Sequence, residues 1–392
     1  MAGNGPTILI TDDVKVNRTL VRQCLNGYDY TFLEADNGFE ALATVHSQKV
    51  DLVILDLLMP VVDGFAFLRA LQAEPLYRSI PVIVNSSLED AGSIRHALEL
   101  GCYDYFIKAL PRGELALILP LKVRNAVQWK RLFDDLALKN QTLEKEINAA
   151  GKYQRFLLPK NIQAKGMRIE TIFHPYLGVG GDFFDIVPLR NDKTGIILAD
   201  VSGHGVLPAM ITAILKPLFH QYIDETESPQ ATLRSLNTDL LILTDEADYI
   251  TAFVGVFDPH WQRFTYANAG HPPPLYLHRA GHAVDILKAT GALLGVFESP
   301  EWSTEERTLS VAADDRVLLV TDGMFESRSG SGEAFGFESL ERVLRQQAGC
   351  SLKHALHVLW EQLQDFTGRR FTDDVTGIAI DFVGEERCVV SG

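Results

Sequence analysis

Cysteine is scarce in this 392-residue sequence. The four cysteines are far apart and show no C-x-x-C spacing; they are Cys24, Cys102, Cys350 and Cys388. A disulfide framework or a zinc site needs clustered thiols, so neither is predicted. We expect all four to be separate thiols in the core or at the surface.

Long apolar runs and a basic leader are also missing. No uninterrupted apolar segment approaches the roughly 20 residues that span a bilayer. The opening stretch, MAGNGPTILITDD, reaches an acidic pair with no basic segment and no extended apolar region before it. Such a start is unlike a secretory signal. These features predict a cytoplasmic protein with no membrane partner.

Positive charge is in deficit. Lysine and arginine total 36 against 51 aspartates and glutamates, which gives a formal net charge of −15 at pH 7. A protein that binds the phosphate backbone of nucleic acid needs the opposite balance, and no basic helix-turn-helix pattern is present. We therefore predict no nucleic-acid partner. The excess acid suits divalent cations or serves solubility alone.

The length allows two or three domains of ordinary size, and the first differs in pattern from the rest. From Thr7 to about Lys122, short strand-like runs alternate with helical stretches. The runs are TILIT, YTFLEA, VDLVILD, PVIVNSS and DYFIK. Alternation of this kind predicts an α/β, doubly wound, five-stranded parallel sheet with helices on both faces. We assign this domain to residues 1–122.

A charged helical segment follows, from about Pro120 to Gly151. Its apolar residues approximate a three-four repeat that Lys139 and Glu146 interrupt. They are Trp129, Leu132, Leu136, Leu143 and Ile147. Because fewer than about four clean heptads are present, a single connecting helix and a coiled coil that forms a homodimer both stay open. We predict a helical linker over residues 123–158, which ends at Leu158 before a proline.

The remainder of the chain, residues 159–392, is rich in strand-like runs. They are GIILADV, TAFVGVFD, FTYANAG, DRVLLVTDG and VTGIAIDF, with helical stretches near residues 209–223, 229–243 and 351–366. Strands in series with grouped helices predict an α+β sandwich, in which helices cover two antiparallel sheets.

Polar side chains follow the strands of the first domain. Asp12 and Asp13 follow TILIT, and Asp56 follows VDLVIL. Ser86 follows PVIVN, and Lys108 follows DYFI. Ligands collect at the carboxyl ends of parallel strands, and three carboxylates that meet there repel one another unless a cation offsets them. Oxygen ligands favour Mg²⁺ at this edge of the sheet.

This arrangement resembles the receiver domain of two-component response regulators, over about the first 120 residues. The resemblance implies that Asp56 is the phosphoacceptor and that a histidine kinase is the upstream partner. It also implies that Asp12, Asp13 and Asp56, with the backbone carbonyl of Leu58, bind Mg²⁺. A carboxylate is a workable nucleophile when cations neutralise the incoming phosphoryl oxygens.

The same resemblance assigns three further residues. Lys108 would contact the phosphoryl group, and Ser86 with Tyr105 would form the switch pair that moves on phosphorylation. One departure concerns the loop after the lysine, where receivers usually carry proline. Here Ala109 follows, and Pro111 comes two residues later. Since a cis bond before a residue other than proline costs roughly 3 kcal/mol, we expect this turn to differ.

Acids recur at turns and strand ends in the C-terminal segment. They are Asp182, Asp185, Asp200, Asp322, Asp373 and Asp374. One Asp-Gly after a strand is usually a turn, but several motifs in one sandwich bring carboxylates to the same end. Such a cluster is tolerable only around cations, and carboxylates select Mg²⁺ or Mn²⁺. Two such ions form the clamp used for hydrolysis of phosphate esters. No Walker loop, Ser-His-Asp set or cysteine nucleophile offers competing chemistry.

In this order, and with QRFLLP, NAGHPPP, TGALLG and GEAFG, these motifs resemble the metal-dependent serine/threonine phosphatases related to protein phosphatase 2C. The closer match is the bacterial branch that contains RsbU and SpoIIE, over about residues 150–383. The resemblance implies two Mn²⁺ or Mg²⁺ ions bridged by Asp200, with the backbone carbonyl of Val201 as a further ligand. The other ligands would be Asp182, Asp322 and Asp373.

The correspondence is incomplete around the site. Asp374 stands where many relatives have asparagine, so we rank it as a supporting residue. Eukaryotic enzymes carry a histidine two residues after the bridging aspartate, but here that position is Ser202, and His204 lies two residues further on. We therefore assign no general acid. We expect His271, in NAGHPPP, to shape the surroundings of the site rather than bind metal.

Together the two resemblances imply a response regulator whose phosphorylation controls a phosphatase. Its substrate would be a phosphorylated anti-sigma-factor antagonist, a small STAS domain that acts in partner switching. A change in how the linker helices pair would carry the signal. The alternative is a non-catalytic adaptor like RssB, which has the same architecture, lacks the metal ligands, and binds a sigma or anti-sigma factor. The acids present here weigh against the adaptor.

Overall fold

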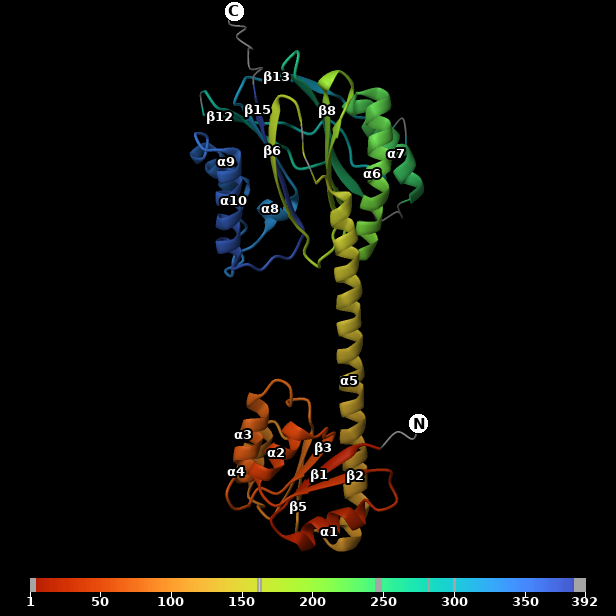
Figure 1. Ribbon diagram of the computed structural model, residues 1–392, viewed down its shortest axis with the longest axis vertical. Coiled ribbons are helices and arrows are strands. Elements are labelled where there is room, and N and C mark those ends of the chain that lie inside the picture. Colours follow the sequence, from red (N-terminus) through yellow and green to blue (C-terminus); the bar gives the residue numbers. More distant parts are fainter. Residues whose placement is uncertain are drawn as a thin grey trace, which may run out of the picture. The chain divides into compact units, whose positions relative to one another are not determined.

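The computed structural model describes residues 5–160, 162, 164–243, 249–280, 282–298 and 301–383. The chain divides into two compact units, Met1–Leu143 and Glu144–Gly392, and each is described by itself (Figure 1). Three cysteines, Cys24, Cys102 and Cys350, are free thiols, as expected. The fourth, Cys388, lies outside the described residues.

The first unit is built on a parallel sheet with strand order β2-β1-β3-β4-β5. Its strands are β1 (Thr7–Thr11), β2 (Thr31–Ala35), β3 (Leu52–Leu55), β4 (Val82–Ser86) and β5 (Asp104–Ile107). Its helices are α1 (Lys15–Cys24), α2 (Gly38–Ser47), α3 (Gly64–Ala73), α4 (Ala91–Glu99) and the first part of α5 (Arg112–Leu157). The predicted doubly wound fold is confirmed.

Alternating side chains distribute the core to both faces of this sheet. Leu9 of β1 packs into a cluster with α2 and α3, while Ile8 and Ile10 pack into a second cluster with α1 and α5. A strand turns successive side chains to opposite faces, so a continuous apolar run buries both. The helices begin where side chains cap their free N–H groups. The caps are Asn37 for α2, Asp63 for α3 and Asp90 for α4.

Helix α5 begins at Arg112, earlier than the predicted start of the linker at residue 123. Leu115, Leu119 and Val123 explain the difference, because they are buried against the receiver sheet. The helix ends at Leu157, within a residue of the expected end. The boundary between the two units, after Leu143, falls inside this helix. Its predicted repeat residues Leu132, Leu136 and Leu143 are more than half exposed in the single chain.

The second unit is a sandwich of two antiparallel sheets, as predicted. Their strand orders are β13-β10-β9-β8-β7 and β12-β11-β14-β15-β6. The first sheet contains β7 (Asp182–Pro188), β8 (Thr194–Val201), β9 (Ile250–Asp258), β10 (Arg263–Ala269) and β13 (Arg307–Ser310). The second contains β6 (Met167–His174), β11 (Leu275–His278), β12 (Ala283–Ile286), β14 (Arg316–Val320) and β15 (Val375–Phe382).

Helices cover both outer faces of the sandwich (Figure 1). On the first sheet lie α6 (Val206–Thr226) and α7 (Pro229–Leu243), and on the second lie α8 (Asp322–Glu326), α9 (Phe337–Gln346) and α10 (Leu352–Thr367). A third cluster fills the space between the sheets, with Phe184, Phe253 and Ile378 among its members. Four layers thus enclose three apolar cores.

Among the described helices, α6 alone is long and apolar enough to cross a membrane by length and composition. Its buried side chains pack against the first sheet; they are Ile211, Leu215, Phe219 and Ile223. Midway along the helix, Lys216 is paired with the buried Asp185 of β7. The apolar composition of α6 is therefore accounted for by its place in the core.

Candidate functional site

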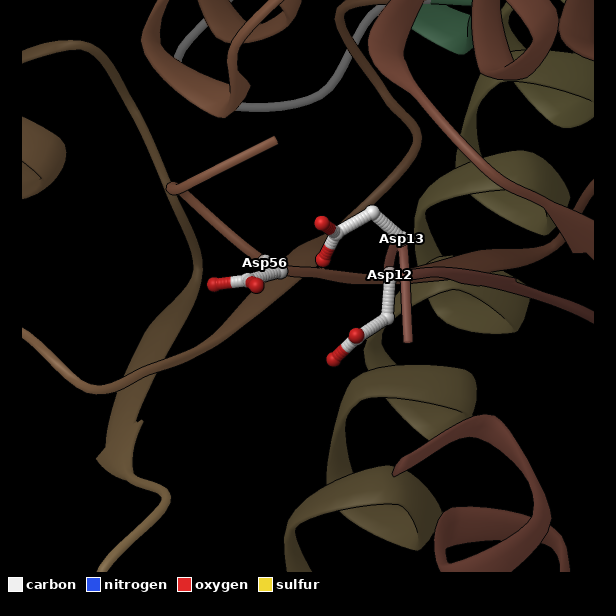
Figure 2. Close-up of side chains that lie close together, drawn as sticks. All are labelled: Asp12, Asp13 and Asp56. Carbon is white, nitrogen blue, oxygen red and sulfur yellow. The ribbon is translucent and has the colours of Figure 1, made fainter. Parts of the chain in front are cut away.

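The three acids of the receiver unit come together at one edge of the sheet. Asp12 and Asp13 follow β1, Asp56 follows β3, and their ligand oxygens all lie within 4.8 Å of one another. Figure 2 shows the three carboxyl groups gathered around one small region. Neighbouring backbone explains the convergence, because the Asp56 N–H donates to the Thr11 carbonyl at 2.8 Å. This bond places Asp56, which follows β3, beside Asp12, which follows β1.

Lys108 offsets the charge of this cluster. Its Nζ lies 2.7 Å from Asp12 Oδ2 and 2.6 Å from Asp56 Oδ2. Burial raises the pKa of Asp56, while Lys108 acts in the opposite direction. Burial alone would lower the pKa of Lys108, but its bonds to Asp12 and Asp56 raise it overall. The lysine therefore stays charged beside the two carboxylates.

The predicted switch residues lie on adjacent strands. Ser86 ends β4 and is fully buried, and Tyr105 lies on β5. The Tyr105 hydroxyl donates to the Leu88 carbonyl at 2.6 Å, and the Leu88 N–H donates to Ser86 Oγ at 3.4 Å. Leu88 thus connects the pair. The Leu58 N–H donates to Asp56 Oδ1 at 3.3 Å, which ties the loop after β3 to the acid.

The loop after Lys108 is short and leads directly into α5. The Lys108 N–H donates to the Ser86 carbonyl at 2.9 Å, and the chain turns within a few residues. Pro111 stands directly before α5, and its carbonyl accepts from the N–H groups of Glu114 and Leu115 at 3.0 Å. The displaced proline therefore begins a helix, where its lack of an N–H costs nothing.

The acids of the second unit come from both sheets of the sandwich. Asp182 of β7 and Asp200 of β8 are direct cross-strand partners and face the second sheet. Asp322 follows β14 as the first residue of α8, and Asp373 and Asp374 precede β15. Because β14 pairs with β15, the end of β14 lies beside the start of β15, and the three acids follow or precede these strand ends. One end of the sandwich thus carries five of the six acids named from the sequence, while the sixth, Asp185, lies on the other face of β7 and pairs with Lys216.

These acids act on one another electrostatically. Burial raises the pKa of Asp200 to about 8, and Asp322, Asp373 and Asp374 add to the shift. Burial, followed by Asp373, raises the pKa of Asp322 to about 6. The pKa of Asp182 is also raised well above its usual value, first by burial and then by Asp200. Shifts of this kind mark carboxylates that need a cation in order to ionise together.

The second cluster is wider than the first. Within the described parts of the chain, only the receiver acids bring three ligand atoms within 4.8 Å of one another. Glycine lets backbone approach this second site: a Cβ on Gly181 would lie 2.3 Å from the Val201 carbonyl oxygen. That oxygen is the predicted backbone ligand. These donors suit hard cations such as Mg²⁺ or Mn²⁺, because every donor is an oxygen.

Asp374 differs from the other four acids. Its carboxylate accepts from the Tyr176 N–H at 2.8 Å and from the Gly181 N–H at 2.7 Å. A Cβ on Gly180 would lie 1.9 Å from one of its oxygens. Burial raises the pKa of Asp374, and these N–H groups lower it. Asp374 therefore holds the loop that leads to Asp182, which suits the supporting rank it had from sequence.

Sequence reasoning missed Gln154, near the end of α5. Its side chain is 5% exposed and donates to the Gly180 carbonyl at 2.7 Å and to Thr212 Oγ1 at 3.2 Å. The Gly180 N–H donates back to Gln154 Oε1 at 3.2 Å. Gly151, one turn earlier, would place a Cβ 1.9 Å from the Gly178 carbonyl oxygen. The signal was present in QRFLLP, where Gln154 stands in the last turn, before the apolar residues that end the helix.

His204 lies in a loop between two glycines with left-handed backbone, Gly203 with φ +88° and Gly205 with φ +99°. Its ring is exposed and contacts the ring of Tyr176 edge-on, with 6.1 Å between centroids. Ser202 exchanges backbone and side-chain hydrogen bonds with Tyr249. His271 is buried, 2% exposed, and its Nδ1 lies 2.8 Å from Thr251 Oγ1. His271 therefore contacts Thr251, the cross-strand partner of Asp200.

Comparison with known proteins finds family matches in both units of the chain. The family model for the response regulator receiver domain matches residues 8–119, and the model for stage II sporulation protein E (SpoIIE) matches residues 190–383. The phosphoserine phosphatase RsbP of Bacillus subtilis (strain 168) is 34% identical over 187 residues, which are 47% of this chain and 46% of RsbP. The phosphoserine phosphatase RsbU of the same organism is 24% identical over 241 residues, 61% of this chain and 71% of RsbU.

A solved structure supports the fold of the second unit. The SiaA-PP2C domain of Pseudomonas aeruginosa superposes with a TM-score of 0.56 at 21% identity, covering 63% of this chain and 99% of that domain. This chain spans about half the length of RsbP. The chain therefore combines a region that matches the response regulator receiver domain, at residues 8–119, with a region that matches the SpoIIE family, at residues 190–383, and the second unit has the fold of the SiaA-PP2C domain.

Proposed function

We propose that this chain is a response regulator in which phosphorylation of Asp56 controls a metal-dependent serine/threonine phosphoprotein phosphatase. The observation that carries the proposal is the cluster of acids at one end of the second unit's sandwich, where Asp200 and Asp322 have pKa values raised to about 8 and about 6. A surface that only binds a partner has no need for carboxylates that repel one another.

The phosphatase unit would hold its two metal ions through Asp200, the Val201 carbonyl, Asp182, Asp322 and Asp373. Bound there, Mn²⁺ or Mg²⁺ supplies the Lewis acidity for hydrolysis of a phosphate ester. Asp200 suits the bridging position, because no described residue forms a hydrogen bond to its carboxylate and both oxygens stay available. Asp374 would orient the loop that bears Asp182. The general acid stays unassigned.

In the receiver unit, Asp12, Asp13 and Asp56 with the Leu58 carbonyl would hold Mg²⁺. Asp56 would accept the phosphoryl group from a histidine kinase, and Lys108 would neutralise its oxygens. Lys108 already lies within 2.6 Å of Asp56 Oδ2, so little movement is required. Ser86 and Tyr105, which are connected through Leu88, would move when Asp56 is phosphorylated and so change the surface of the unit.

The end of α5 supports control of the phosphatase by its linker. Gln154 holds the Gly180 backbone through both its N–H group and its carbonyl, and Gly181 in turn binds Asp374. A shift of this helix end would therefore move the loop before Asp182. Whether the exposed linker residues pair with a second copy stays a prediction.

We propose the substrate, the partner and the location from the likeness to these relatives. RsbP and RsbU are named phosphoserine phosphatases. By that likeness, the substrate would be a phosphorylated serine or threonine of a STAS-type anti-sigma-factor antagonist, in the cytoplasm. Release of the phosphate would free the antagonist to bind its anti-sigma factor.

Hydrolysis of p-nitrophenyl phosphate and of a phosphorylated antagonist with Mn²⁺ tests the proposal. We expect metal-dependent turnover that Asp200→Asn abolishes and Asp185→Asn retains, since Asp185 lies on the opposite face of the same sheet and pairs with Lys216. No metal-dependent activity on either substrate, together with binding of a sigma or anti-sigma factor, would favour the RssB-like adaptor.

Regulation has a separate test. An acyl-phosphate donor should change the phosphatase rate of the wild type and leave that of Asp56→Asn unchanged. Gln154→Ala should retain the receiver's phosphorylation and lose the response of the phosphatase, with Gln128→Ala, an exposed glutamine of the same helix, as the matched control. Equal rates with and without the donor in the wild type would contradict control by Asp56.

A further inference from the structure

His271 is held rigidly at the point where the chain passes from one sheet of the sandwich to the other. It follows β10 and Gly270, which has φ +66°, and three prolines then lead to β11. Its N–H donates to Asn268 Oδ1 at 2.8 Å, and its carbonyl accepts from Asn268 Nδ2 at 3.0 Å. Asn268 is itself fully buried. The imidazole therefore has little freedom of position.

The ring of His271 is a neutral acceptor. Burial lowers the pKa of His271 to about 3, with the Val320 carbonyl acting in the opposite direction. Its Nδ1 lies 2.8 Å from Thr251 Oγ1, while its Nε2 forms no hydrogen bond with any described residue. A neutral imidazole has one protonated nitrogen and one acceptor. We take the tautomer that carries the proton on Nε2, in which Nδ1 accepts the hydroxyl proton of Thr251.

Thr251 is the cross-strand neighbour of Asp200. The two residues are direct partners in the β8–β9 ladder, so both side chains leave the same face of the sheet. Cβ atoms of such partners are roughly 5 Å apart, within reach of a hydroxyl-to-carboxylate hydrogen bond. On the other side of Asp200 stands Asp182, whose Oδ2 does accept from a threonine, Thr321, at 2.8 Å. The carboxylate of Asp200 accepts from no described residue.

We propose that His271 is a positioning residue: it engages the hydroxyl proton of Thr251 and so keeps that proton off Asp200, which leaves both Asp200 oxygens for cations. A threonine hydroxyl has a single proton to donate, so the bond to Nδ1 and a bond to Asp200 exclude each other. The inference rests on the proposed metal site of the phosphatase unit. It gives a role to His271 of the NAGHPPP motif, which is neither a proposed metal ligand nor part of the apolar core.

Mn²⁺ titration of the full chain by calorimetry tests the proposal through a double-mutant cycle. His271→Phe frees the Thr251 hydroxyl, so Mn²⁺ affinity should fall about tenfold, as for other groups that orient a metal ligand. Thr251→Val alone should bind as the wild type does. The double variant should recover wild-type affinity, because no hydroxyl remains to compete. His271→Asn, which keeps an acceptor at the Nδ1 position, should also bind normally.

Two controls separate this inference from the proposed function. Asp200→Asn retains the receiver site, so its isotherm is subtracted from the others, and thermal melting without metal reports folding. If His271→Phe does not fold, His271→Gln moves the acceptor one bond away and should weaken binding in the same way. A double variant that binds as weakly as His271→Phe would overturn the role of His271. A wild type that binds no more Mn²⁺ than Asp200→Asn would instead overturn the metal site.

Discussion

The two acid clusters of this chain differ in what offsets their negative charge. In the receiver unit, Lys108 reaches both Asp12 and Asp56, and the three acids stand close together. In the phosphatase unit, every influence resolved on Asp200 raises its pKa, and none comes from a basic side chain. The receiver acids are therefore partly neutralised by a lysine of their own unit, whereas the proposed metal site of the second unit would need cations from solution to offset its charge.

A third arrangement lies on β7, the strand that also carries Asp182. Asp185 of β7 faces α6, where Lys216 and His220 both contact its Oδ2. Asp182, three residues earlier, faces the second sheet and has no basic partner among the groups that act on it. One strand thus carries a structural acid on one face and a candidate metal ligand on the other, and substitutions can tell the two apart.

The largest expected effect is the loss of phosphatase activity in Asp200→Asn. Removal of the bridging carboxylate should lower Mn²⁺-dependent hydrolysis of p-nitrophenyl phosphate by about a thousandfold or more. The melting temperature in the presence of a chelator should stay the same or rise, because the substitution removes the repulsion between Asp200 and the neighbouring acids. A fall in both activity and chelated melting temperature would mean that Asp200 is structural, like Asp185.

Asp185→Asn should give the opposite result. The change leaves Lys216 without its buried partner, so the free energy of unfolding should fall by about 2–3 kcal/mol. Metal-dependent turnover at a temperature where the variant is folded should stay close to that of the wild type. Scanning calorimetry and the hydrolysis assay on the same sample check both statements.

Lys108→Met tests the receiver side of the comparison. Asp12 and Asp56 then face each other without compensation, and we expect a loss of about 1–2 kcal/mol in the free energy of unfolding without Mg²⁺. Added Mg²⁺ should restore part of this loss, because the ion takes over the role of the lysine. Urea unfolding with and without Mg²⁺ measures the difference. Equal stability of variant and wild type without Mg²⁺ would show that the lysine does not offset the acids.

The smallest expected effect is a pH dependence of the stability that Asp185 contributes. Burial alone would raise the pKa of Asp185, but its bonds to His220 and Lys216 outweigh burial and lower the pKa below 3.8. A lowered folded-state pKa stabilises the protein above the unfolded value, and this contribution is lost as the pH falls through the folded value. The stability gap between the wild type and Asp185→Asn should therefore be constant above about pH 5 and shrink at lower pH. A gap that widens on acidification would contradict the ion pair.

Much of the fold could be predicted from the order of strand-like and helical runs. The β-branched runs of the first domain became the five strands of a parallel sheet, and the later runs became the antiparallel sandwich. Helix α5 begins at Arg112, before the predicted linker at residue 123, because sequence periodicity alone does not separate the residues that pack on the first sheet, such as Leu119, from those of the linker. Tertiary burial decided that boundary.

The candidate acids could also be found in the sequence, since each stands at the end of an apolar run. What sequence could not supply was their partners. Asp185 and Asp182 occur in one motif, VGGDFFD, and only the sheet shows that they face opposite sides. Gln154 and His271 lie far from the acids in the chain, and their contacts with Gly180 and Thr251 depend on how the layers pack.

The sequence by itself therefore determined the residue types, the strands that carry them and the families that they resemble. This is because local propensity and strand period act over a few residues. The tertiary structure alone decided which acids are compensated by a basic side chain and which have no basic side chain among the groups that act on them. Charge compensation depends on distances between residues far apart in the chain, and only folding sets those distances.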